Sequence, residues 1–362
     1  MSEGGTRMRL YYDDQKELGP VFRDLWRTIF KDPEAYEVFY FQTIYPKNRV
    51  LALEKDDKIA GMIHLNPYDI CVNGKKLSMH YIVGVATMEK YRRQGIMRRM
   101  LTRCMKDMAD QGEVFTYLMP ANRLYYEPFD FTIVQYFRTI HTPGTDAGGS
   151  KLSVLKPEEY ERASDFVNAY CHNNFQVYTK FDPEYLKQLQ KETESEHGEM
   201  LVWKKHDSIC GFCCYGCDEE TVYVRQIFCD DMDAMIREIK AKFSKKQLEL
   251  TLCAEKEANG ASIMVRILRL DLLMNRISAV KEAELRIQIT DSVLESQNGI
   301  FRINFSPKGC SLERTDLPCV QTISIQELTK ILFGVDCENL LEKYPDFQLI
   351  KPLGPVMIGE II

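Results

Sequence analysis

Apolar residues follow two different periods along this chain. Segments 21–30 (VFRDLWRTIF) and 234–243 (AMIREIKAKF) repeat them at helical steps of three and four. Segments 51–65 and 201–215 instead read as a strand, a polar turn and a second strand. Antiparallel strands flanked by helices predict an α/β fold with mixed sheets.

The two strand-turn-strand segments match each other without a gap. At an offset of 150 residues, LALEKDDKIAGMIHL and LVWKKHDSICGFCCY share five of fifteen positions. The shared positions are Leu51 and Leu201, Lys55 and Lys205, Asp57 and Asp207, Ile59 and Ile209, and Gly61 and Gly211. A match at a fixed offset predicts two copies of one domain. The proline and glycines of TPGTDAGGSKLS (142–153) predict the boundary between the copies.

The residues after Ser262 form a third region that repeats neither copy. Helical and strand periods alternate there, for example in ELRIQITDS and SIQELTKILFG, which predicts another α/β domain. We therefore expect three domains, over residues 1–148, 149–260 and 261–362.

The composition narrows the class of protein. Of 362 residues, 45% are hydrophobic and 28% are charged, which allows large cores in two or three domains. A net charge of −6 argues against a nucleic-acid partner, because a phosphate-binding surface needs an excess of Lys and Arg. The chain start lacks an apolar signal core and no run reaches about 18 apolar residues, so neither secretion nor a membrane partner is expected. The expected compartment is the cytoplasm, where twelve scattered cysteines stay reduced.

The stretch CGFCCYGC (210–217) has the paired C-x-x-C spacing of zinc and iron-sulfur sites. The repeat lays it over a strand, however, with Cys210 in the place of Ala60 and Cys213 in the place of Ile63. In a strand these two cysteines lie roughly 10 Å apart on opposite faces, whereas zinc needs sulfurs about 2.3 Å from one ion. We therefore expect strand packing and no metal.

Residues 81–112 combine a strand, a polar turn and a helix. The small and β-branched run after Tyr81 leads into the turn RRQG (92–95), and the helix that follows ends at Gly112. The apolar positions expected on its buried face are Met97, Met100, Leu101, Cys104, Met105 and Met108.

Such a turn can bind phosphate. The first N–H groups of a helix are unpaired at its positive end, and a glycine lets the backbone come close to a ligand. Arg92 and Arg93 add positive charge. A solvated basic turn before a core helix explains the same pattern, so these features alone leave both interpretations open.

The turn also resembles a known signature. GNAT N-acetyltransferases carry Q/R-x-x-G-x-G/A between a strand and a helix, and residues 92–97 read RRQGIM, with Met97 in the last place. Together with YLMPANRLYYEPFDF (117–131), the duplication and the third region, this resembles the Eis (enhanced intracellular survival) acetyltransferase family over essentially the whole chain. The resemblance implies tandem GNAT-fold domains followed by a sterol-carrier-protein-like domain. It also implies acetyl-CoA as co-substrate and assembly into homo-hexamers.

The resemblance assigns the cofactor site to the strand, the turn and the start of the helix. The backbone around Val83 and Val85 would pair with the pantetheine arm, and Asn122 would lie beside the cofactor. The residues that would hold the pyrophosphate, through backbone N–H groups or charge, are Arg92, Arg93, Gln94, Gly95, Ile96, Met97 and Arg98.

The resemblance assigns catalysis to two groups far apart in the sequence. Tyr126, followed by Phe129 and Phe131, takes the place of the family's catalytic tyrosine and would give a proton to the departing thiolate. The C-terminal carboxylate of Ile362 would accept a proton, although a free α-carboxyl with a pKa of roughly 3.3 to 3.7 is a weak base. A packing aromatic and a frayed terminus are the alternatives for these two positions.

The acceptor is expected to be a small molecule with several amines. DLWRTIFKDPEAYEVFYF (24–41) offers aromatic surface together with acidic side chains that would attract a polycation. Trp26 and Tyr36 are the candidate substrate contacts, although core packing at helical spacing explains both as well.

The second copy is not expected to bind acetyl-CoA, because Asp230, Asp231 and Asp233 stand where the first copy has RRQG. The leading hypothesis is an acetyl-CoA-dependent N-acetyltransferase that acts on primary amines of polyamine-like substrates or aminoglycosides. A protein-lysine acetyltransferase is the alternative enzyme. A binding or scaffolding protein whose third domain carries an apolar ligand is the non-enzymatic alternative.

Overall fold

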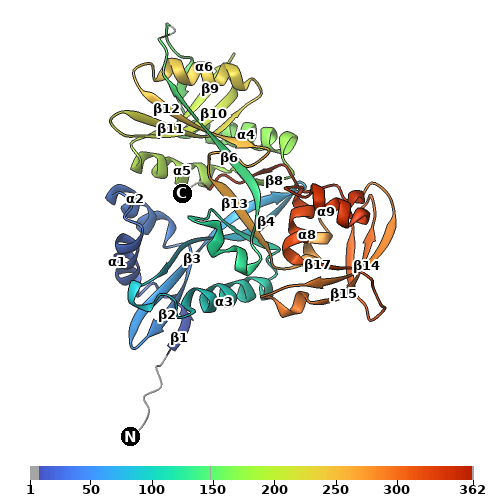
Figure 1. Cartoon of the computed structure of the whole chain (residues 1–362). Coiled ribbons are helices and arrows are strands. Elements are labelled where there is room, and N and C mark those ends of the chain that lie inside the picture. The colour runs from blue at the N-terminus through green and yellow to red at the C-terminus, as the bar shows by residue number, and fades with distance from the viewer. Residues whose placement is uncertain (1–7, 147, 361–362) are drawn as a thin grey trace. The chain divides into compact units, whose positions relative to one another are not determined.

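The computed structural model describes residues 8–146 and 148–360, and the chain folds as two units (Figure 1). The first unit consists of Met1–Pro33, Phe41–Val134 and Ile263–Gly354. The second consists of Glu34–Tyr40, Gln135–Ser262 and Pro355–Ile362. Each unit thus combines segments that are far apart in the sequence, and the division into three domains stays a prediction.

A mixed sheet forms the core of the first unit, with the strands in the order β1-β2-β3-β4-β5-β13. The bounds are β1 (Met8–Tyr12), β2 (Arg49–Lys55), β3 (Lys58–Val72), β4 (Lys75–Thr87), β5 (Phe115–Leu118) and β13 (Ser262–Ile267). Neighbouring strands are antiparallel except β4 and β5, which pair in parallel at Tyr81 and Tyr117. Helix α1 (Gly19–Ile29) packs against β4, and α3 (Ile96–Asp110) packs against β2, β3 and β4.

A four-stranded sheet in the C-terminal region also belongs to the first unit, in the order β16-β15-β14-β17. The elements of this region are α7 (Leu270–Met274), β14 (Ala283–Thr290), η6 (Glu295–Gln297), β15 (Gly299–Phe305), β16 (Ser311–Arg314), β17 (Thr322–Ser324), α8 (Ile325–Phe333), α9 (Glu338–Lys343) and η7 (Pro345–Leu349). The predicted alternation of helices and strands is confirmed. Strand β13, however, pairs with β5 and so extends the sheet of the N-terminal residues.

The second unit contains a sheet in the order β6-β12-β11-β10-β9-β7 and a short parallel pair, β8 with β18. Its strands are β6 (Thr132–Pro143), β7 (Leu152–Val154), β8 (Val177–Thr179), β9 (Glu199–Lys205), β10 (Ser208–Cys217), β11 (Thr221–Cys229), β12 (Gln247–Ala254) and β18 (Val356–Met357). Its helices are α2 (Glu34–Phe39), η5 (Pro157–Glu159), α4 (Tyr160–Asn174), α5 (Pro183–Ser195) and α6 (Met232–Lys242), and the π-helix η1 (Tyr40–Ile44) leads from Tyr40 of this unit into the first.

The two copies share one topology, which confirms the predicted tandem fold. In each, two antiparallel strand pairs lead into a helix and then a parallel strand, as β2-β3-β4-α3-β5 and as β9-β10-β11-α6-β12. The polar turn of the first hairpin has two positive-φ residues in both copies, Asp56-Asp57 and His206-Asp207. A bulge follows at equivalent positions, where one extra residue, Ala60 or Cys210, lacks a partner on the preceding strand.

A second bulge also recurs, one strand later. Gly84 and Val85 of β4 lie opposite the single residue Ile63, and Gln226 and Ile227 of β11 lie opposite Cys213 in the same way. The first residue of each bulge has a positive φ, 59° at Gly84 and 51° at Gln226. Such a bulge bends and twists the strand that carries it. In both copies the pairing with the parallel neighbour ends before the bulge, at Tyr81 of β4 and at Val224 of β11.

A side chain of α1, Trp26, packs against the bulge in β4. A Cβ built on Gly84 would lie 2.5 Å from a ring carbon of Trp26 and 3.2 Å from the ring of His64. Trp26 itself is only 2% exposed, and its indole Nε1 donates to Asp32 Oδ2 at 2.8 Å. The close approach of the indole ring thus requires glycine at this position, and glycine also adopts the positive φ without strain.

The cysteine-rich stretch lies in β10, so its prediction as a strand is confirmed. Cys213 and Cys214 are fully buried, and Cys213 belongs to the hydrophobic core beneath α6. Within residues 8–146 and 148–360, no group of three or more His, Cys, Asp or Glu side chains is placed to hold a metal ion.

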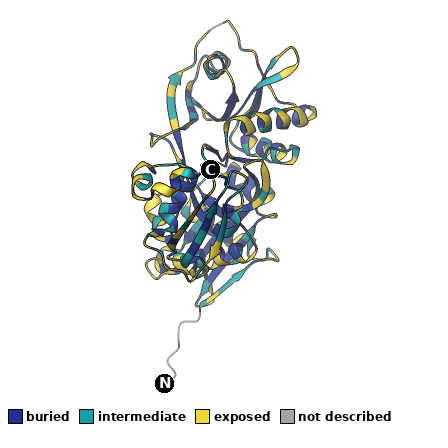
Figure 2. Cartoon of the chain, turned by 90° about the vertical axis from the view of Figure 1, so that its right-hand side faces the viewer, coloured by how far each residue is buried: buried dark blue, intermediate teal, exposed yellow. Residues whose placement is uncertain are grey.

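Burial agrees with the predicted periodicity of the helices. Figure 2 shows helices with both buried and exposed residues, and α3 is an example. The positions expected on its buried face are buried except Met97, which is half-buried. None of the helices in the described ranges is long and apolar enough to cross a membrane.

The C-terminal tail packs inside the second unit. Ile358 N donates to Gln135 Oε1 at 2.8 Å, and Gln226 Nε2 donates to Gly359 O at 2.6 Å. Thr179 Oγ1 donates to the buried carboxylate of Glu360 at 3.0 Å. The residue at the second bulge thus binds the chain's own tail.

We expect Gly84→Ala to destabilise the protein by about 2–5 kcal/mol, because a side chain there adds left-handed strain to a clash with Trp26. Gly112→Ala is the matched control: Gly112 also has a positive φ of 84°, but a Cβ there meets nothing within 4 Å. Urea unfolding followed by tryptophan fluorescence measures both losses. Equal losses for the two variants would show that the contact with Trp26 costs nothing.

We also expect the tail to make stability depend on pH. Burial raises the pKa of Glu360 from 4.5 to about 7, so between these values the folded protein binds more protons than the unfolded chain. This contribution to the free energy of unfolding therefore falls as the pH rises from about 4.5 to 7, by up to roughly 3 kcal/mol. Unfolding of the wild type and of Glu360→Gln at pH 5 and pH 8 tests this, since the variant should lose less stability. The same pH dependence in both proteins would refute it.

Candidate active site

Strand β4 leads through a short turn into α3, and the turn exposes the predicted phosphate-binding residues. The 3-10 turn η2 (Glu89–Tyr91) ends in the buried ring of Tyr91, which fixes the turn to the core. Residues 92–95 that follow are exposed. Arg93 and Gly95 both have positive φ, 60° and 73°, so the backbone adopts the left-handed conformation twice before the helix begins.

The N-terminus of α3 is uncapped by any side chain that the structure describes. Its first helical hydrogen bond runs from Arg99 N to Gly95 O at 3.0 Å, so the N–H groups of residues 96–98 have no acceptor within the helix. The helix dipole adds positive potential at this end. The turn can therefore hold an anionic group such as a pyrophosphate. A Cβ on Gly95 would meet nothing within 4 Å, so the turn requires its φ rather than its small size.

The charged and polar side chains in and beside the turn differ in their contacts. Arg92 is exposed, with a long contact of 3.4 Å from its Nε to Thr87 O. Gln94 is held by Lys55 and by the carbonyl of Lys90, which fixes the middle of the turn. The Arg98 guanidinium lies over the ring of Phe129 at 5.0 Å. Arg98 thus links the turn to the segment that contains Tyr126.

The edge of β4 is open beside the turn. Within the described residues, β4 and β5 pair only at Tyr81 and Tyr117, before the Gly84 bulge. Val83 and Val85 are half-buried on either side of Gly84. An exposed strand edge can pair through its backbone with an extended, amide-bearing ligand. An open edge at this position is compatible with backbone pairing to a pantetheine arm. The assignment of individual residues stays a prediction.

Tyr126 lies between two short 3-10 turns, η3 (Arg123–Tyr125) and η4 (Glu127–Phe129). It is 9% exposed and packs edge-on against Phe131, with 5.8 Å between the ring centroids. Burial raises the pKa of its phenol to about 12, so the group is protonated at neutral pH and can act as a proton donor. Asn122 accepts a hydrogen bond from Leu124 N at 3.0 Å and caps the first of these turns.

The predicted substrate contacts fall in different units. Trp26 is buried in the first unit beside Gly84, and Tyr36 is 8% exposed in the second unit, where it packs against Phe39. Both are packed aromatics in this structure, and their contact with a substrate stays a prediction. Ile362 lies outside the described residues, so the role of its carboxylate also stays a prediction.

The two histidines near the site, His64 and His80, are each held by contacts with neighbouring side chains. His64 is fully buried among aromatic rings, and burial lowers its pKa to about 3, so it is neutral at physiological pH. His80 Nδ1 lies 2.6 Å from Glu113 Oε1.

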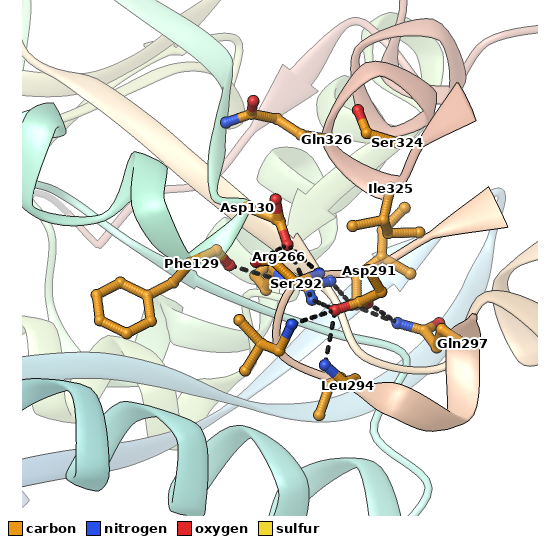
Figure 3. A network of polar contacts seen from close by, with 12 residues as sticks. Phe129, Asp130, Arg266, Asp291, Ser292, Leu294, Gln297, Ser324, Ile325 and Gln326 are labelled. Carbon is orange, nitrogen blue, oxygen red and sulfur yellow. Dashed lines mark hydrogen bonds and ion pairs between the residues drawn. The ribbon is translucent and has the colours of Figure 1, made fainter. Parts of the chain in front are cut away.

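A buried ion-pair network behind Tyr126 was not predicted. Arg266 on β13 is fully buried and contacts Phe129, Asp130 and Asp291 (Figure 3). The only signal in the sequence is the pair of arginines, Arg266 and Arg269, inside the apolar run SIMVRILRL (262–270), which indicates a buried charge but not its partners. The partners are separated from Arg266 by up to 137 residues.

Comparison with protein families identifies two domains. Residues 15–134 match the model of an acetyltransferase (GNAT) domain, which includes the strand, turn, helix and Tyr126 described above. Residues 271–344 match the model of a sterol carrier protein domain. No curated protein matches the chain by sequence.

Solved structures share the fold over almost the whole chain. A conserved protein of unknown function and probable N-acyltransferase from Enterococcus faecalis has a TM-score of 0.77 at 15% identity, covering 96% of this chain and 94% of its own. A GCN5-related N-acetyltransferase from Anabaena variabilis also has a TM-score of 0.77, at 14% identity and with 96% and 99% coverage. Eis1 from Mycobacterium abscessus has a TM-score of 0.66 at 14% identity, with 97% and 94% coverage.

These findings confirm the predicted GNAT resemblance and the architecture that includes a sterol-carrier-protein-like region. Residues 15–134 are a GNAT acetyltransferase domain, so this chain is an acyltransferase that also carries a sterol carrier protein domain.

Proposed function

We propose that the protein transfers an acetyl group from acetyl-CoA to a primary amine of a polycationic small molecule, such as an aminoglycoside. The observation that carries this proposal is the exposed turn 92–95 before the uncapped N-terminus of α3, beside the bulged edge of β4. A chain of amides followed by a pyrophosphate, as in coenzyme A, matches an open strand edge that ends in an anion site. Val83 and Val85 would bind the pantetheine arm, and the N–H groups at the start of α3 would bind the pyrophosphate.

The reaction needs only proton transfers from this chain. The neutral amine attacks the thioester carbonyl carbon, a carbon–nitrogen bond forms, and the carbon–sulfur bond then breaks. The Tyr126 phenol, which is protonated at neutral pH, would give its proton to the departing thiolate as the carbon–sulfur bond breaks. The proton lost by the amine would pass to the carboxylate of Ile362, directly or through water. Because that carboxylate is a weak base, its negative charge near the developing ammonium is as important as its proton affinity.

The second copy lacks the features that the proposal requires. Asp231 Oδ1 accepts the hydrogen bond of Ala234 N at 2.9 Å and so caps the N-terminus of α6, where the first copy is uncapped. Gln226 replaces Gly84 at the bulge and donates to the tail. A cavity of about 250 Å³ beside this bulge is lined by Met357 of the tail. We therefore propose one acetyl-CoA site per chain.

The finer assignments rest on the family resemblance. It supports an aminoglycoside or polyamine as acceptor and a homo-hexamer as the assembly. A protein-lysine acetyltransferase remains the alternative enzyme, and a peptide substrate beside the small amines decides between them.

We expect Tyr126→Phe to lower kcat by about a hundredfold, because the thiolate then leaves without its proton donor. Thiol release from acetyl-CoA with kanamycin, spermine and a lysine-containing peptide as acceptors measures the rate. Tyr125→Phe is the matched control, since Tyr125 is the adjacent residue, is 59% exposed and should keep wild-type activity. Full activity of Tyr126→Phe would contradict the proposed general acid but not the reaction class.

We expect calorimetric titration to give one coenzyme A molecule bound per chain. Gly95→Ala should weaken binding by about tenfold, because the left-handed turn that aims the N–H groups at the ligand is then strained. Asp231→Asn, which keeps the helix cap in the second copy, should leave the affinity unchanged. Two bound molecules, or equal weakening by both variants, would contradict a site confined to the first copy.

A further inference from the structure

Arg266 is fully buried and is the centre of a polar network in the first unit (Figure 3). Its Nε donates to Phe129 O at 2.8 Å, and its Nη1 donates to Ile267 O at 2.5 Å. Its Nη2 donates to Asp291 Oδ1 and lies 3.7 Å from Asp130 Oδ2. One buried cation thus joins the segment after Tyr126 to the C-terminal region.

Asp291 is fixed on its other side by its own turn. Its carboxylate accepts hydrogen bonds from Val293 N at 2.9 Å, Leu294 N at 2.7 Å and Gln297 Nε2 at 2.8 Å. With these donors and Arg266 around it, the buried carboxylate is fully compensated. The position of Arg266 is therefore set from the C-terminal side.

Three successive residues after Tyr126 are held by C-terminal side chains. Arg266 binds the carbonyl of Phe129, and Gln326 Nε2 of α8 donates to Phe131 O at 3.0 Å. Between them, Asp130 Oδ2 accepts from Ser292 N at 3.0 Å and from Ser292 Oγ at 2.6 Å.

The segment needs such support because its own structure is weak. Tyr126 lies between two three-residue 3-10 turns, which have poor hydrogen-bond geometry and little stability of their own. Asp130 ends the second turn with a φ of 61°, a conformation that aspartate and asparagine tolerate better than most residues. The position of the Tyr126 ring therefore depends on contacts made at Phe129, Asp130 and Phe131.

We infer that the C-terminal region is a positioning platform for the catalytic tyrosine, and that Asp130 and Ser292 are positioning residues which hold the Tyr126 hydroxyl in place for proton transfer. The inference rests on the proposed role of Tyr126. It assigns the sterol-carrier-protein-like region a part in the acetyl transfer itself, beyond any ligand of its own. Arg266 and Asp291 support the same contacts from inside the core.

Two substitutions at the exposed end of the network test the inference without opening the core. Asp130→Asn keeps a residue that tolerates a positive φ but removes the charge, and Ser292→Ala removes one hydrogen bond. Each should lower kcat with acetyl-CoA and kanamycin by roughly tenfold, because small displacements of a catalytic group are costly. The KM for acetyl-CoA should change by less than about twofold. Glu127→Gln is the control in the same segment, since the Glu127 carboxylate forms a half-exposed pair with Arg123 at 3.6 Å, and it should keep the wild-type kcat.

A double-mutant cycle separates positioning from a general loss of structure. In the Tyr126→Phe background, Asp130→Asn and Ser292→Ala should cause no further loss of kcat, since there is no hydroxyl left to misplace. An equal loss in both backgrounds, or wild-type kcat for both single variants, would overturn the inference. If Tyr126→Phe lowers kcat but the two variants do not, the inference alone fails. If Tyr126→Phe has no effect, the proposed general acid fails and the inference fails with it.

Hydrogen exchange gives a readout that does not depend on turnover. Amides of residues 126–131 should exchange faster in Asp130→Asn than in the wild type, while those of α3 stay unchanged. Unchanged exchange in this segment would show that Asp130 does not hold it and would overturn the inference.

Discussion

The indole ring of Trp26 lies 2.5 Å from where a Cβ of Gly84 would begin, so the bulge in β4 has no room for a side chain. With φ at 59°, Gly84 is the first residue of a bulge that places two residues of β4 opposite one of β3 and bends the strand beyond its pairing with β5. The open edge of β4 and the direction in which the chain enters the turn 92–95 both follow from this bend. A buried indole ring thus helps to shape the strand edge at which we propose that the pantetheine arm binds, although Trp26 is itself almost inaccessible.

The two copies share one fold but differ at the positions that the proposed cofactor site uses. Both retain the bulge, the following helix and the parallel strand, but the second replaces glycine by Gln226 and caps its helix with Asp231. The amide of Gln226 is then available for the chain's own tail at Gly359. In the second copy the residue at the bulge therefore binds Gly359, while Gln135 and Thr179 from other strands hold Ile358 N and Gly359 N.

Local patterns predicted much of this structure, and long-range pairing accounts for the rest. The helix of residues 96–110, the hairpins near Asp57 and Asp207, and the strand that contains the cysteines all follow from periodicity and turn residues. The bulge at Gly84 was not predicted, because a glycine in a strand does not reveal which ring packs on it. Nor did any pattern connect Arg266 with Asp130 and Asp291, since burial and charge indicate that a partner exists without saying which one. The interleaving of segments in the two units likewise depends on contacts between distant residues.

The most direct test of the account is the identity of the product. Mass spectrometry after incubation of the full chain with acetyl-CoA and either kanamycin or spermine should show the amine with one or more acetyl groups, together with free coenzyme A in equal amount. Free acetate with an unmodified amine, or no consumption of acetyl-CoA with any amine or lysine peptide, would contradict the claim that this chain is an amine acetyltransferase.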